Sequence, residues 1–410
     1  MTTNDATWAF VRDHRTDDVR QLALRYAGHD GIDMPFALDQ IQGWQTARGK
    51  LPSWAATDGI VYPPHLNMEQ CSSEATARYK ASLLSGLNDA TLIDLTGGLG
   101  VDFAFMAPHF ARAVYVERDE RLCETARHNF GVLGLENTEV VNGDGTKYLM
   151  RLNESGNRRF IYIDPARRDS HGRKVYGIED CTPDVLALKD TLLARAYKTM
   201  IKLSPMLDWH AAAKAFAGAC REVHIVSVAN ECKELLLVIE GGHDSGDSGE
   251  RHQIRLACVN DGQRFETMVT PSASTAGPTL IDSEEAMRPG RCLLVPNASV
   301  MKAGTFAAIT EAFHVAMADR DSHLFFGDDC DANGFPGRRF VISEVSTMNK
   351  RELRQKLAGL TRANVSVRNF PMSAESLRRR LRLADGGDTF VFATTALGKH
   401  WIIVAKPLRA

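Results

Sequence analysis

The 410-residue chain lacks long apolar runs and closely spaced cysteines. No stretch approaches the roughly 20 apolar residues that a membrane-spanning helix needs, and residues 1–5 (MTTND) lack the basic and apolar regions of a signal peptide. The eight cysteines form no Cys-x-x-Cys pair, which argues against a zinc site and against a dense disulfide framework. We therefore expect a cytoplasmic protein with reduced, buried thiols, no metal and no membrane contact.

The chain also has little net charge, −2, but that charge is unevenly distributed. Residues 338–410 contain 15 Lys and Arg against 5 Asp and Glu, so they carry +10 and the residues before them carry −12. With 44% hydrophobic and 24% charged residues, the composition is that of an ordinary globular protein. A chain of this length allows about two to four domains. The last of them is predicted to be basic.

A glycine-rich turn stands between two apolar segments. Residues 90–93 (ATLI) predict a buried strand, residues 103–107 (FAFMA) predict a helix, and residues 94–102 between them read DLTGGLGVD. Glycines let a backbone adopt positive φ and approach a ligand closely, and the N-terminus of the following helix offers unpaired N–H groups. This turn predicts binding of a nucleotide-like cofactor.

Three further predicted strands also end in polar residues. The second strand, 113–116, ends at Glu117, where a carboxylate can accept hydrogen bonds from ribose hydroxyls. The third, 138–141, is followed by the segment NGDG (142–145), and the fourth, 160–163, by the segment DPAR (164–167). Four such strand ends predict a doubly wound α/β sheet with its site at the carboxyl edge.

The acidic residues of the turn distinguish two possible cofactors. NAD-type turns hold a pyrophosphate, which a carboxylate inside the turn would repel. Here Asp94 opens the turn and Asp102 closes it. S-adenosylmethionine carries a sulfonium and an ammonium group, and both are attracted to carboxylates. The turn therefore favours S-adenosylmethionine.

These motifs resemble those of the class I S-adenosylmethionine-dependent methyltransferases, which implies a Rossmann-like sheet and S-adenosyl-L-methionine as cofactor. Gln70 and Ser73 lie before the first strand, in a segment that could fold over the cofactor, and we predict that both contact it. An ordinary helix cap is the alternative role. The predicted cofactor-binding residues are Gln70, Ser73, Asp94, Thr96, Gly97, Gly98, Gly100, Asp102, Glu117, Arg118, Asn142, Asp144 and Gly145.

The segment after the fourth strand is the predicted catalytic motif and comprises Asp164, Pro165, Ala166 and Arg167. Methyl transfer needs mainly a nucleophile held in line at about 3 Å, and Asp164 with the Pro165 carbonyl could direct a base nitrogen. Amino-methyltransferases commonly place an aromatic residue after this motif, which this chain lacks. Methylation of uracil at C5 needs a cysteine after the next strand. The sequence there is KLSP (202–205), so we disfavour that reaction.

We predict four domains: a helical region at 1–85, the methyltransferase domain at 86–270, a small α+β module at 271–335 and a basic βαβαββ tail at 336–410. The segments 364–371, 377–381 and 386–389 resemble the THUMP-like C-terminal domain of a bacterial methyltransferase family, whose other marks are 62–73 and 296–302. This resemblance implies a ferredoxin-like module at 271–335. It also implies RNA binding, because THUMP domains proper belong to RNA-modifying enzymes.

The basic helices of the tail give a physical reason to expect RNA. Arginines that neutralise phosphates release counterions and so favour binding. We predict RNA contacts by Arg378, Arg379 and Arg382, although a solvated helix face is the alternative. The leading hypothesis is an RNA-modifying methyltransferase that acts on a base nitrogen. The alternatives are a methyltransferase of a protein or small molecule, and a non-catalytic RNA-binding protein that retains the cofactor.

Overall fold

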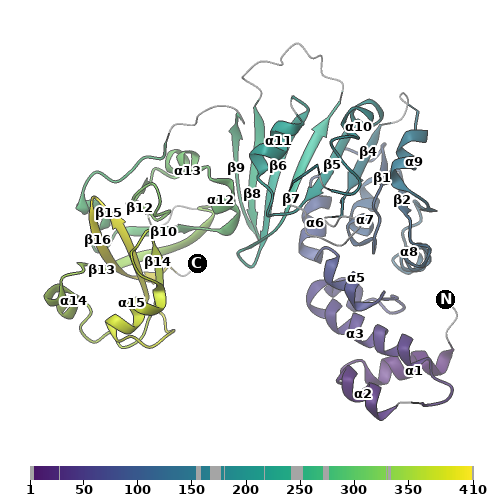
Figure 1. Cartoon of the computed structure of the whole chain (residues 1–410), viewed down its shortest axis with the longest axis horizontal. Coiled ribbons are helices and arrows are strands. Elements are labelled where there is room, and N and C mark those ends of the chain that lie inside the picture. The colour runs from purple at the N-terminus through teal and green to yellow at the C-terminus, as the bar shows by residue number, and fades with distance from the viewer. Residues whose placement is uncertain are drawn as a thin grey trace. The chain divides into compact units, whose positions relative to one another are not determined.

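The computed structural model describes residues 4–26, 28–153, 158–166, 177–179, 181–216, 218–241, 253–270, 277–328, 330 and 334–408. The chain forms two compact units, one of Met1–Glu222 with Leu235–Gly249 and one of Val223–Glu234 with Glu250–Ala410. Figure 1 labels their helices and strands. No described helix has the length and apolar character needed to cross a membrane.

Helices fill the described part of the first 85 residues, as the sequence predicts. Most begin at a polar residue whose side chain accepts a backbone N–H of the first turn, for example Asn4, Asp18 and Ser73. The helices are α1 (Asp5–His14), α2 (Val19–Arg25), α3 (Met34–Lys50), α4 (Pro52–Ala55), α5 (His65–Gln70) and α6 (Glu74–Ser82).

A nine-stranded mixed sheet follows, and its parallel part positions the site. Its strands are β1 (Thr91–Asp94), β2 (Arg112–Glu117), β3 (Thr138–Asn142), β4 (Arg159–Ile163), β5 (Lys198–Leu203), β6 (Cys220–Val228), β7 (Glu231–Glu240), β8 (Ile254–Asn260) and β9 (Gln263–Val269). The strand order is β3-β2-β1-β4-β5-β7-β6-β8-β9. The chain runs outward from β1 to β3 and then returns to β4, so the order reverses between β1 and β4. Ligands bind at such a switch point, and the predicted doubly wound sheet is confirmed.

The connections of this sheet are helical. They are α7 (Val101–Met106), η1 (Ala107–His109), α8 (Glu120–Val132), α9 (Gly145–Arg151), α10 (Lys189–Arg195) and α11 (Trp209–Ala215). The ring of Phe103 on α7 packs between Tyr115 of β2 and Phe130 of α8, with ring centroids 5.6 and 5.0 Å away. This aromatic core fixes the first βαβ unit beneath the glycine turn.

A second sheet occupies the C-terminal part of the chain in the order β11-β12-β10-β13-β16-β15-β14. Its strands are β10 (Cys292–Pro296), β11 (Ala316–Met317), β12 (Phe325–Gly327), β13 (Gly337–Thr347), β14 (Asn364–Arg368), β15 (Phe390–Ala396) and β16 (Lys399–Pro407), with η3 (Glu284–Met287), α12 (Ala298–Ala303) and α13 (Phe306–Phe313) around them. The predicted module 271–335 and the predicted tail thus contribute strands to one sheet.

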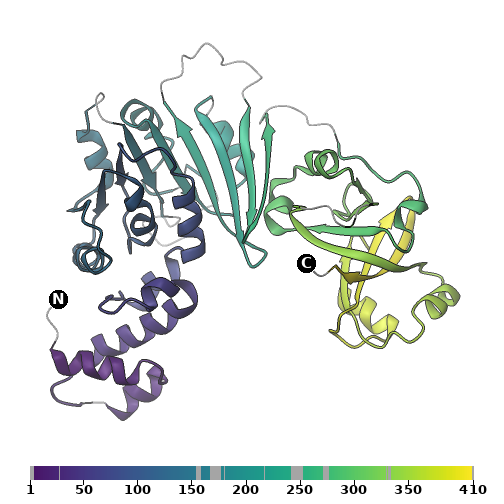
Figure 2. The same cartoon turned by 180° about the vertical axis from the view of Figure 1, so that it is seen from behind.

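The two faces of this sheet have separate cores because neighbouring strand residues point in opposite directions. Phe392 and Ile403 belong to one core, whereas Val391 and Ile402 belong to the other. Two helices, α14 (Lys350–Lys356) and α15 (Ala374–Leu381), pack their leucines into the second core and lie on the same side of the sheet in both views (Figures 1 and 2). The βαβαββ order predicted for the tail is confirmed.

One cysteine pair corrects the expectation of reduced thiols. Cys292 and Cys330 form a disulfide, with their Cα atoms 5.2 Å apart. Cys292 begins β10, whose neighbour β12 ends three residues before Cys330, so strand pairing brings together two residues separated by 38 positions. The other six cysteines are free. The pair could not be predicted from the sequence, because it depends on this pairing of β10 with β12.

Candidate active site

The carboxyl ends of β1 and β4 meet at the switch point and are joined through Thr96. The carboxylate of Asp94, the last residue of β1, accepts a hydrogen bond from the Thr96 backbone N–H at 2.9 Å. The hydroxyl of Thr96 accepts the backbone N–H of Asp164 at 2.7 Å. The glycine turn and the predicted catalytic motif therefore lie side by side.

Two glycines have the special backbone roles expected of this turn. Gly100 adopts a φ of 80° at the N-cap of α7, a conformation that costs other residues energy. Gly145 begins α9 so close to the turn that a Cβ atom there would lie 2.0 Å from the carbonyl oxygen of Leu95. The residue before it, Asp144, caps α9 by accepting the backbone N–H of Lys147 at 3.0 Å. The end of β3 thus lies beside the turn.

Glu117 joins the ends of β1 and β2. Its Oε2 accepts the N–H of Gly98 at 2.9 Å, and its Oε1 accepts those of Arg118 and Asp119 at 2.8 and 2.9 Å. Asn142 donates from Nδ2 to the carbonyls of Glu117 and Arg118, both at 3.1 Å. The residues predicted to meet the ribose and adenine are therefore gathered around one short stretch of backbone.

Asp102 lies in a buried polar cluster, which we call the Asp102 cluster: Ser72, Lys80, Asp102, Tyr162 and Lys202. The Asp102 carboxylate accepts hydrogen bonds from the hydroxyls of Ser72 and Tyr162, both at 2.7 Å, and lies 3.1 Å from Lys80 Nζ and 3.6 Å from Lys202 Nζ. Burial raises the pKa of Asp102, but the two lysines and the hydrogen bonds outweigh it and lower this pKa to about 2. Its predicted cofactor contact stays a prediction.

Lys202 is a site residue that the sequence did not reveal. It lies near the end of β5, and its Nζ is 2.5 Å from Asp164 Oδ2 and 3.2 Å from Ser72 Oγ. The available signal was a basic residue near the end of a largely apolar strand, at the same sheet edge as Asp164. Periodicity alone could not show which carboxylate it meets.

The remaining carboxylates make the site strongly acidic. Burial raises the pKa of Asp94 well above its ordinary value, and the negative charges of Asp102, Asp164 and Glu117 raise it further. A ligand that brings positive charge relieves this repulsion, whereas a pyrophosphate increases it. The electrostatics of the site therefore fit S-adenosylmethionine.

The other predicted residues are placed as follows. Ser73 caps α6 by accepting the Thr76 N–H at 3.3 Å, so the capping role considered for it is confirmed, and Gln70 is an exposed residue at the end of α5. Ala166 pairs with Thr182 through two backbone hydrogen bonds of 2.8 and 3.0 Å. Pro165 precedes it, and Arg167 lies outside the described residues.

The predicted RNA-binding arginines lie at the end of α15, and two of them have acidic partners. Arg378 pairs with Asp385 and Arg379 with Glu375, both at 3.0 Å, whereas Arg382 has no ion pair among the residues described. Arg382 caps the helix with a φ of 57° and is exposed.

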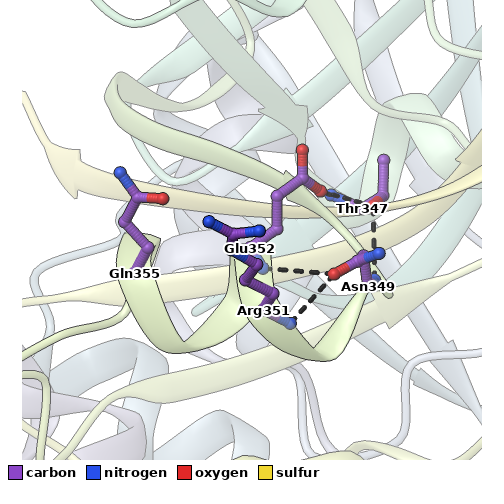
Figure 3. Close-up of a pocket in the computed structure, with 5 residues that line it drawn as sticks. All are labelled: Thr347, Asn349, Arg351, Glu352 and Gln355. Atoms are coloured by element: carbon purple, nitrogen blue, oxygen red, sulfur yellow. Dashed lines mark hydrogen bonds between the residues drawn. The ribbon is translucent and has the colours of Figure 1, made fainter.

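Helix α14 carries further exposed cations: Lys350, Arg351 and Arg354. They form no ion pair within the described part of the chain, and with Gln355 they line a shallow hollow. An adjoining hollow is shown in Figure 3, where Glu352, the acidic residue of this helix, points toward Thr347 and binds its N–H and hydroxyl. The carboxylate is thereby held by the sheet rather than by the cations.

The fold and site are those of an S-adenosylmethionine-dependent methyltransferase, and the relatives of this chain imply S-adenosylmethionine as its cofactor. It is 26% identical over 328 residues to S-adenosylmethionine-dependent methyltransferases, described as uncharacterized, of two Mycobacterium tuberculosis strains; the match covers 77% of this chain and 79% of theirs. The crystal structure of a proposed methyltransferase from Porphyromonas gingivalis W83 matches with 28% identity, 100% coverage of both chains and a TM-score of 0.83.

More particularly, the C-terminal part carries two recognised domains. Residues 293–336 match a ferredoxin-like domain, and residues 337–407 match a family described as THUMP domain-like. The resemblances stated for the tail and for the module before it are therefore confirmed.

Proposed function

We propose that this protein transfers a methyl group from S-adenosylmethionine to a base nitrogen in RNA. The observation that carries the proposal is the position of Asp164 at the switch point, with 37% of its side chain exposed beside the acidic cofactor residues. An exposed carboxylate at this point can accept an N–H of the incoming base. The predicted motif of Asp164, Pro165, Ala166 and Arg167 is proposed as the place where the nucleophile is positioned.

The residues of the site have separate tasks in this reaction. Asp94 and Glu117 bind the ammonium and ribose ends of the cofactor, which when bound supplies the methyl group on a sulfonium. Asp164 and the Pro165 carbonyl accept hydrogen bonds from the nucleophilic amine, so that its lone pair faces the methyl group at about 3 Å. The cofactor would supply the methyl group and leave as its demethylated product, and the nitrogen that accepts the methyl group would release a proton to solvent.

The cofactor proposal predicts the outcome of isothermal calorimetry. We expect the protein to bind S-adenosylmethionine or its demethylated product and not NAD. Asp94→Ala should weaken this binding by about 1.5–3 kcal/mol, the range for a hydrogen bond to a charged group. Asp89→Ala is the matched control, because the Asp89 carboxylate is 69% exposed and pairs with Arg158. Binding of NAD without binding of S-adenosylmethionine would refute the assignment.

The basic helices α14 and α15 are proposed as the RNA-binding surface. They pack against the same face of the THUMP domain-like sheet, and both expose cations. Phosphate contacts with such cations give affinity that falls steeply with salt. Because Arg378 and Arg379 already have carboxylate partners, the unpaired cations of α14 should contribute more of this dependence than those of α15.

A filter-binding titration at several salt concentrations checks this surface. Replacing Lys350, Arg351 and Arg354 together with Ala should weaken RNA binding and flatten its salt slope by about two to three, close to one per lost phosphate contact. Replacing Arg378, Arg379 and Arg382 together with Ala should also weaken RNA binding and flatten the salt slope, but by less. Affinity for S-adenosylmethionine should stay unchanged in both variants. Salt-insensitive binding by the unaltered protein would favour a protein or small-molecule substrate.

The experiment that tests the proposed function compares RNA nucleosides from a strain that lacks the gene with those from its parent. Mass spectrometry should detect one methylated base in the parent that is missing from the deletion strain. The same base should return when the gene is restored and should stay absent when the restored copy carries Asp164→Ala. A nucleoside pattern that is identical in both strains would count against RNA as the substrate.

A further inference from the structure

The two oxygens of the Asp164 carboxylate have different surroundings. Oδ2 accepts a hydrogen bond from Lys202 Nζ at 2.5 Å, whereas Oδ1 has no hydrogen bond among the described residues. The Asp164 side chain is 37% exposed and that of Lys202 is 15% exposed. One oxygen is therefore anchored from within the protein, and the other remains available at the surface of the site.

The Asp102 cluster explains why the charge of Lys202 is directed to Asp164. Lys80, which is fully buried, lies 3.1 Å from Asp102, closer than the 3.6 Å that separates Lys202 from the same carboxylate. Hydroxyls of Ser72 and Tyr162 complete the contacts of Asp102. Among the described residues, Lys80 thus lies nearest to the Asp102 carboxylate and Lys202 nearest to that of Asp164. Ser72, from the loop between α5 and α6, also accepts a hydrogen bond from Lys202 at 3.2 Å.

We infer that Lys202 is a positioning residue for methyl transfer, and that it acts by fixing one oxygen of Asp164 so that the other faces the substrate amine. The inference rests on the proposed function, because it assumes that Asp164 accepts the N–H of the nucleophile. Without the ammonium group, the Asp164 carboxylate lies near Asp94 and has no cation to hold it among the described residues. The carboxylate then turns away from its productive direction, and the alignment on which transfer depends is lost.

The test measures transfer of labelled methyl groups from S-adenosylmethionine into total RNA from the deletion strain. Lys202→Met should lower kcat by about tenfold or more, while the KM for S-adenosylmethionine changes by less than about threefold, because a misaligned Asp164 weakens the transition state and not the binding of the cofactor. Lys202→Arg should recover much of the activity, since it restores a cation that donates hydrogen bonds. A merely structural role would not give this separation of kcat from KM.

Lys198→Met is the matched control, because Lys198 begins the same strand and pairs with Glu240 at 2.7 Å, away from the site. It should leave kcat within about twofold of the unaltered protein. Unchanged kcat in Lys202→Met would overturn the inference while the proposed function stands. An arginine variant as inactive as the methionine variant would also overturn the inference. Arginine keeps the positive charge but cannot accept a proton, so that result would mean that the charge of Lys202 is not what matters. Absence of methyl transfer by the unaltered protein would instead refute the proposed function.

Discussion

Asp164→Ala should lower turnover on RNA by about tenfold or more and leave the affinity for S-adenosylmethionine within a few fold. The expectation follows from the position of the carboxylate. Its backbone is fixed by Thr96, one oxygen is fixed by Lys202, and the other accepts no hydrogen bond from the described residues. An interaction that forms fully only when the amine is aligned stabilises the transition state more than the bound cofactor. The loss should therefore appear in kcat.

Single-turnover transfer of labelled methyl groups to RNA from the deletion strain measures this effect, and calorimetry measures the affinity for the cofactor. Asp164→Asn provides a second variant, because its amide oxygen still accepts a hydrogen bond while the ion pair with Lys202 is lost. The turnover of Asp164→Asn should lie between that of the alanine variant and that of the unaltered protein. Asp208→Ala is the control, since Asp208 caps α11 after the next strand and is exposed. Unchanged turnover in Asp164→Ala would remove this residue from the mechanism.

The arrangement of strand ends could be predicted from the sequence because its signals are local. Apolar runs of about five residues ending in Asp94, Glu117, Asn142 or Asp164 indicate both a strand and the edge at which it stops. In a parallel sheet those ends share one edge, so their proximity follows without knowledge of packing. The last two strands of the βαβαββ order predicted for the tail are likewise β15 and β16, whose apolar runs are buried.

Contacts between side chains of distant segments could not be predicted in this way. The Asp102 cluster joins residues from a loop, two helices and two strands between positions 72 and 202, and no period relates them. The same is true of the Cys292–Cys330 disulfide. On α15 the sequence showed how many arginines there are. It did not show that Asp385, beyond the helix, pairs with Arg378 and thereby reduces the charge available to a phosphate.

The two carboxylates of the glycine turn, Asp94 and Asp102, have different roles. The sequence placed carboxylates at both ends of the glycine turn, and the structure separates their roles. Asp94 is buried among negative charges that raise its pKa, whereas Asp102 is neutralised by Lys80 and Lys202, which lower its pKa despite burial. A cationic ligand therefore gains most from Asp94 and Glu117, because Asp102 and Asp164 both have lysine partners. Asp102 is better placed to hold the N-terminal helices against the sheet.

This role of Asp102 leads to a large expected effect on stability. Asp102→Ala should lower the free energy of unfolding by about 3–5 kcal/mol, because it leaves Lys80, whose side chain is fully buried, without its carboxylate. The Ser72 and Tyr162 hydroxyls lose their acceptor in the same change. Urea denaturation followed by tryptophan fluorescence measures this loss in the free energy of unfolding, since four of the five tryptophans lie in the compact unit that contains Asp102.

The same ion pair predicts how stability depends on pH. The pKa of Asp102 is lowered from its ordinary value of 3.8 to about 2, so the folded state favours the charged carboxylate. Its contribution to stability should be fully present above about pH 4 and should be lost as the pH falls toward 2. In Asp102→Ala this part of the acid dependence should be missing. The double variant with Lys80→Met should be less destabilised than the sum of the single variants, because it removes the buried charge together with the carboxylate that faces it. Additive effects would mean that Lys80 and Asp102 do not stabilise one another.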